Sequence, residues 1–214
     1  MPAEVYGEKY EFLPRPHILS FEEIERLTRL FARIGVSKVR ITGGEPLVRA
    51  NLPDLISKLS VIDGIDDIAL TTNGYLLENN ATELKDAGLN RLTISLDSID
   101  PDVFKEMSGR PQGPENTLAG IKAAASLGFE QIKINVVVQR GVNEHTLVDT
   151  ARYFKGTGAI VRFIEFMDVG TKNGLELSQV FTSTEVIQTI NAEFPIEPIE
   201  SNYKGEVASR YRYV

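Results

Sequence analysis

The chain has 214 residues, of which 42% are hydrophobic, and it carries a net charge of −7 with a pI near 5.0. This length predicts one domain over residues 1–214, and the acidic charge disfavours nucleic acid and anionic membranes as partners. The sequence has no cysteine, which excludes disulfides, thiolate nucleophiles and cysteine-ligated clusters in the chain as written.

The first residues, MPAEVYGEKYEFLP, lack both a basic start and an apolar core. No signal peptide is therefore expected, no apolar run approaches the roughly 18 residues of a membrane span, and the cytoplasm is the expected location. His17 follows this segment, and His145 opens a later helix. They are not at metal-ligand spacing, so no metal site is expected, and we interpret both as structural or surface groups.

Helices and strands then alternate along the chain. Ser20 and Glu23 form a capping box that predicts a helix ending at Gly35, and a second box at Thr182 and Glu185 predicts a late helix. Strands are expected over 37–42, 68–72, 91–97, 131–139 and 159–167, with helices over 52–60, 77–87, 101–107, 115–127 and 143–155, and the tail resembles another strand. This order predicts an α/β protein with a parallel sheet and right-handed crossovers.

Four consecutive strands share one pattern, apolar at one parity and polar at the other. The polar positions are Arg40, Thr42, Thr71, Asn73, Thr93, Ser95, Asp97, Lys133 and Asn135. A parallel sheet covered by helices on both faces would be apolar on both. The polar parity therefore predicts the interior of a barrel that holds water and a polar ligand. An open sheet with one solvated face is the alternative.

A glycine turn follows the first strand. Gly43 and Gly44 let a ligand approach the main chain closely, and Glu45 adds a carboxylate at the carboxyl end of the strand, where parallel α/β proteins build sites. A structural turn with a surface Glu is the alternative.

Two cations, Arg40 and Lys133, stand on the polar parity and suit a phosphate or carboxylate ligand. The structural alternative is an internal salt-bridge network with Glu45, Asp97 and Glu165.

Five ordered motifs carry a family resemblance: TGGEPLVR, TTNGYLL, SLDSIDPDVF, KINVVVQRGVN and RFIEFMDVG. Together they resemble the radical S-adenosylmethionine (SAM) enzymes of molybdenum cofactor biosynthesis, from Met1 to nearly Val214. The resemblance implies a partial (β/α)6 TIM-like barrel. It implies SAM binding by Gly43, Gly44, Glu45, Ser95 and Met167, and GTP binding by Arg40, Thr71 and Lys133. By itself, Met167 is typical of a core residue.

The resemblance also implies a reaction. A 5′-deoxyadenosyl radical takes the ribose 3′ hydrogen of GTP, and the ribose radical attacks C8 of guanine to give 3′,8-cyclo-7,8-dihydro-GTP. The implied cofactors are SAM and two 4Fe–4S clusters, the implied partner is GTP, and a homodimer is possible. No catalytic residue is identifiable among the motifs.

One departure from the family concerns its cysteines. The family places cluster cysteines before the position of Met1 and again beyond the position of Val214, and it adds a first barrel strand. We therefore expect the central part of such an enzyme, truncated at both ends, unable to hold either cluster and inactive as an isolated chain. The alternatives are a cluster-free module that binds a nucleotide or SAM, and an unrelated (β/α) enzyme with a phosphate-bearing substrate.

Overall fold

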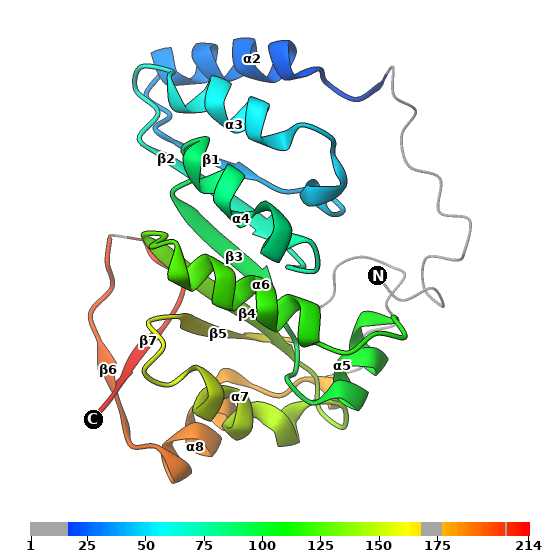
Figure 1. Cartoon of the computed structure of the whole chain (residues 1–214). Helices are drawn as coiled ribbons and strands as arrows, with labels where there is room; N and C mark the ends of the chain where they lie inside the picture. Colours follow the sequence, from blue (N-terminus) through cyan, green and yellow to red (C-terminus); the bar gives the residue numbers. More distant parts are fainter. Residues whose placement is uncertain (1–16, 168–176, 204) are drawn as a thin grey trace.

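The computed structural model describes residues 17–167, 177–203 and 205–214. Five strands form one parallel sheet in the order of the sequence: β1 (Lys38–Ile41), β2 (Asp67–Thr72), β3 (Arg91–Ser95), β4 (Gln131–Val138) and β5 (Ile160–Glu165). Sequential parallel strands joined by right-handed crossovers place all their helices on one side. Figure 1 shows the helices α3 (Leu52–Ser60), α4 (Leu77–Asp86) and α6 (Glu115–Ser126) in front of the sheet. The predicted α/β fold of the partial TIM-barrel type is confirmed.

The helices match the predicted ranges closely. They are α2 (Phe21–Arg33), α3 (Leu52–Ser60), α4 (Leu77–Asp86), α5 (Pro101–Ser108), α6 (Glu115–Ser126), α7 (Leu147–Phe154) and α8 (Ser183–Glu193), with short 3-10 turns η2 (Pro46–Val48), η3 (Glu144–Thr146) and η4 (Leu177–Gln179). Both predicted capping boxes are formed: Ser20 Oγ accepts the Glu23 N–H at 3.1 Å, and Thr182 Oγ1 accepts the Glu185 N–H at 3.3 Å. No helix among the described residues is long and apolar enough to cross a membrane.

The apolar parity of the strands faces the helix layer and forms the core. The fully buried side chains of this layer include Leu70, Leu92, Ile94, Ile134 and Val136 from the sheet, and Leu59, Leu77, Leu84 and Leu147 from the helices. Each such side chain contributes about 1.5–3 kcal/mol through burial. The helix side of the sheet is therefore dry, and the polar parity is left on the opposite face.

A glycine contact fixes the end of β2 against this layer. A Cβ at Gly120 of α6 would lie 2.8 Å from the Gly74 carbonyl oxygen and 2.8 Å from Leu77 Cβ. Gly74 itself has a φ of +75°, which few side-chain-bearing residues adopt. Helix α6 can approach the turn after β2 this closely because both positions lack a side chain.

Two features of the fold are not evident from the sequence. Helix α2 packs mainly against α3 and leaves apolar side chains uncovered: Phe31 is 51% exposed, and Ile34, which caps the helix, is 78% exposed. An unpredicted strand, β6 (Ile196–Ile199), pairs antiparallel with β7 (Arg210–Tyr213) at the lower left of Figure 1. The signal for β6 is weak, because it has four residues and one of them is Pro198.

Candidate functional site

The polar face of the sheet brings most of the predicted binding residues together. Across the strands, Thr71 lies beside Thr93 and Thr93 lies beside Lys133. One step closer to the carboxyl ends of the strands, Ser95 lies beside Asn135. In parallel α/β folds this is the end at which ligands bind.

Arg40 reaches across β2 from the edge strand β1. Its Nη1 donates to Thr71 Oγ1 at 3.0 Å and to Thr93 Oγ1 at 3.1 Å. These hydroxyls hold the guanidinium in place, but as neutral groups they do not compensate its charge.

A further cation, Arg162 of β5, lies on the same face. Its Nε and Nη2 both donate to Asn135 Oδ1, at 2.9 and 2.7 Å. The sequence predicts two cations on this face, Arg40 and Lys133, but Arg162 and Arg91 lie there as well. The sequence of β5 does not show which of its side chains face the polar side of the sheet. Arg162 is placed there by the strand register, which pairs it with Asn135.

Lys133 has no hydrogen-bond partner among the described residues. Burial lowers the pKa of Lys133, and the neighbouring charges of Arg162, Arg91 and Arg40 lower it further. The pKa of Arg162 is also lowered, first by burial and then by Arg40. The Glu206 carboxylate raises the pKa of Lys133, but less than burial and the neighbouring cations lower it.

The predicted alternative of an internal salt-bridge network is wrong for the part of the chain that the structure describes. Glu165 lies on the helix side, where its Oε1 accepts the Ser183 N–H and hydroxyl, both at 2.6 Å. Asp97 Oδ1 accepts the Val137 N–H at 2.8 Å, and burial raises the pKa of this carboxyl. Neither acid forms an ion pair with Arg40 or Lys133: Glu165 lies on the opposite side of the sheet, and Asp97 binds the backbone of β4.

The glycine turn is anchored to the end of β2 by its own carboxylate. Glu45 Oε1 accepts the Thr72 hydroxyl at 2.6 Å, and Oε2 accepts the Asn73 N–H at 2.7 Å. Gly43 and Gly44 are exposed, and a Cβ at Gly43 would meet no atom within 4 Å. The backbone of the turn is thus open to a ligand while Glu45 fixes its position. The sequence does not reveal the role of Thr72, because strand parity directs its side chain to the helix side.

The remaining predicted residues, Ser95 and Met167, are both exposed. Ser95 ends β3 beside Asn135, within the polar face. Met167 lies two residues beyond β5 and is 52% exposed, so its interpretation as a core residue is wrong. Strand parity does not extend to Met167, since β5 ends at Glu165.

A buried amide joins the ends of β3 and β4. Asn143 has no exposed surface; its Nδ2 donates to the carbonyl oxygens of Asp97 and Val137, both at 2.8 Å. Its Oδ1 accepts the Gln139 N–H at 2.8 Å. Asn143 therefore fixes the loop after Ser95 relative to β4.

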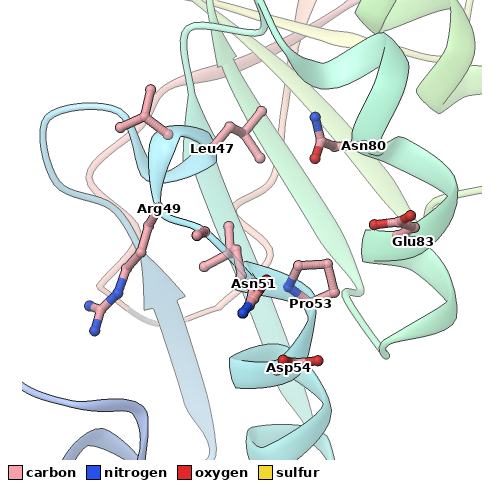
Figure 2. A pocket seen from close by; sticks show the side chains of 10 residues that line it. Leu47, Arg49, Asn51, Pro53, Asp54, Asn80 and Glu83 are labelled. Atoms are coloured by element: carbon pink, nitrogen blue, oxygen red, sulfur yellow. The ribbon is translucent and has the colours of Figure 1, made fainter.

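Two surface cavities lie among the helices, away from the polar face. The first, about 260 Å³, lies between the segment 47–54 and α4, and Figure 2 shows Asn80 and Glu83 of α4 across it from Leu47 and Pro53. The Arg49 side chain points away from α4 in this view, and it donates to the Leu19 carbonyl at 2.6 Å. The second, about 560 Å³, lies between the start of α5 and α7 beside His145.

The chain's own residues do not fit an iron–sulfur cluster. The sequence has no cysteine, and the described residues contain no group of three or more His, Cys, Asp or Glu side chains placed to hold a metal ion.

The sheet topology defines an α/β protein of the partial TIM-barrel class, with polar side chains at the carboxyl ends of its strands. The family model of the radical SAM superfamily matches residues 5–154, and the chain belongs to that superfamily.

Several curated proteins are similar over the whole chain. It is 47% identical over 213 residues to the GTP 3′,8-cyclase of Acidothermus cellulolyticus, covering 100% of this chain and 59% of that protein. It is 46% identical to the GTP 3′,8-cyclase of Staphylococcus epidermidis, covering 62% of it, and 48% identical to that of Xanthomonas campestris pv. campestris, also covering 62%. The chain thus spans about 60% of the length of these relatives.

Solved structures agree with the fold. Methylornithine synthase superposes with a TM-score of 0.67 at 17% identity, over 89% of this chain and 57% of that one. Native anSMEcpe with bound AdoMet superposes with a TM-score of 0.66 at 16% identity, over 84% of this chain and 52% of that one.

Proposed function

We propose that the chain carries the substrate-binding surface of a GTP 3′,8-cyclase, which converts GTP to 3′,8-cyclo-7,8-dihydro-GTP in molybdenum cofactor biosynthesis. The names of the relatives at 46–48% identity support the reaction. The observation that carries the substrate class is the group formed by Arg40, Lys133 and Arg162. None of the three has a carboxylate within ion-pair distance among the described residues, although the whole chain is acidic.

A triphosphate supplies the negative charge that this face lacks. Each hydrogen bond from a cation to a phosphate oxygen contributes about 1.5–3 kcal/mol to the binding free energy. This contribution is larger where the site is partly shielded from water. Arg40 and Arg162 are already oriented by neutral oxygens, so little side-chain entropy is lost when an anion binds. Thr71 adds a hydroxyl beside Arg40.

SAM is the proposed cofactor, bound at the turn formed by Gly43, Gly44 and Glu45, with Ser95 and Met167 as further contacts. The open backbone at Gly43 and the fixed Glu45 carboxylate suit the amino and carboxylate groups of an amino acid. When bound, SAM supplies the radical chemistry of the superfamily. The role of this chain's residues is to bind, orient and shield the two ligands.

Isothermal titration calorimetry tests the substrate class. We expect affinity to fall from GTP to GMP to guanosine, and GTP to bind more tightly than ATP. Arg40→Ala should weaken GTP binding at least about tenfold, which corresponds to the loss of one charge-assisted hydrogen bond, and should leave guanosine unaffected. Lys122→Ala, on the exposed side of α6, is the control. Equal affinity for GTP and guanosine would contradict the proposal.

The absence of cysteine favours a second candidate, a cluster-free binding module for a nucleotide or SAM. A chimaera separates the two: this chain replaces the matching segment of the Staphylococcus epidermidis relative, and cyclase activity is assayed without oxygen. An active chimaera supports the cyclase. A folded chimaera that binds GTP and makes no product supports the module.

A further inference from the structure

The side-chain amide of Asn135, on the polar face, has N–H donors that no acceptor among the described residues uses. Asn135 lies between Ser95 and Arg162 in the register of the sheet, and its Oδ1 accepts both Nε and Nη2 of Arg162. Arginine has only donors, so the amide oxygen must face Arg162 and the NH₂ group must face away from it. The chemistry of the pair thus fixes the orientation of the amide.

The NH₂ group of Asn135 has no acceptor among the described residues, and neither does Nη1 of Arg162. The two side chains are partly buried in the face that also holds Lys133. Unused donors at a partly buried site lose part of their hydration without a protein partner, so a ligand with acceptor oxygens gains from pairing with them.

We propose that Asn135 is a nucleotide-recognition residue: its oxygen fixes the Arg162 guanidinium and its NH₂ group donates to a phosphate oxygen of the same nucleotide. This inference rests on the proposed function. An amide suits both tasks because it holds Arg162 without cancelling its charge. A carboxylate at position 135 would hold Arg162 more strongly, would neutralise it and would repel the phosphate.

The test compares Asn135→Asp with Asn135→Ala, using GTP and guanosine as ligands in calorimetry. We expect Asn135→Ala to weaken GTP binding about tenfold and Asn135→Asp to weaken it about 100-fold or more, with guanosine unaffected in both. Both donation to the ligand and positioning of Arg162 predict this order, because Asp neutralises Arg162 and repels the phosphate in either case; a double-variant cycle separates the two roles. The control is Asn79→Asp on the exposed side of α4, which makes the same charge change away from the sheet.

A double-variant cycle keeps the proposal testable if Asn135→Asp does not fold. Asn135→Ala should weaken GTP binding further in the Arg162→Ala background, because the amide donates to the ligand independently. Loss of the whole Asn135 effect in that background would overturn the direct contact, as would normal GTP binding by Asn135→Asp. If the unmodified chain binds GTP no better than guanosine, the proposed function fails first and this inference with it.

Discussion

Replacing Asn143 with Ala should destabilise the fold measurably, because this side chain has no exposed surface and uses both ends of its amide. The change leaves the Gln139 N–H without its acceptor, and the carbonyl oxygens of Asp97 and Val137 each lose one hydrogen-bond donor. A buried donor left without a partner costs about 1–3 kcal/mol, and each lost hydrogen bond costs about 0.5–1.5 kcal/mol. Partial entry of water lowers the sum, so we expect a loss of about 2–4 kcal/mol.

Urea denaturation followed by circular dichroism measures this loss, and thermal unfolding should show a Tm lower by about 4–16 °C for a domain of this size. Asn79→Ala, at an exposed position of α4, is the matched control and should change stability by less than about 0.5 kcal/mol. A change that small in Asn143→Ala would refute the view that this amide joins the ends of β3 and β4.

Asp97 and Glu185 should affect the pH dependence of folding stability in opposite ways. Burial raises the pKa of Asp97 in the folded state above 3.8, so its contribution is complete below that pH and is lost as pH rises through the folded value. Asp97→Asn, which keeps an acceptor for Val137, should therefore lose less stability than the unmodified chain when pH is raised from 4 to 7, and equal losses would contradict this. Arg140, followed by Thr182, lowers the pKa of Glu185 to about 2, so its contribution is present above 4.5 and is lost as pH falls toward 2. Glu185→Gln should reduce the loss of stability in that acid window, and an unchanged acid transition would exclude this role.

The order of the elements could be predicted from the sequence because the signals that set it are local. Alternation of apolar and polar residues is read within one strand, and the capping box joins Ser20 to Glu23, only three positions further along the chain. The same alternation placed Arg40, Thr71 and Lys133 on one face of the sheet, since parity needs no knowledge of the partner strand.

The contacts within the site could not be predicted, because they join distant parts of the chain. Asn135 and Arg162 are 27 residues apart, and Glu45 lies 27 residues before the hydroxyl that it accepts. Only the register of neighbouring strands brings such residues together. The interpretation of Met167 as a core residue failed for a local reason. Met167 lies just beyond the end of β5, where the alternation of side chains along the strand no longer fixes the direction of a side chain.

The charges of the polar face are only partly paired. Arg91 pairs with Asp67 on this face, and carboxylates also hold cations elsewhere, as in Arg29–Glu25, Lys58–Glu25, Arg140–Glu185, Arg152–Glu193 and Arg212–Glu197. Arg40 and Arg162 are instead held by hydroxyl and amide oxygens. At physiological ionic strength the screening length is about 8 Å. A compact anion at this face would therefore interact more strongly with these cations than with the acidic surface around them. A long polyanion would meet both, so the arrangement suits a compact anion better than an extended one.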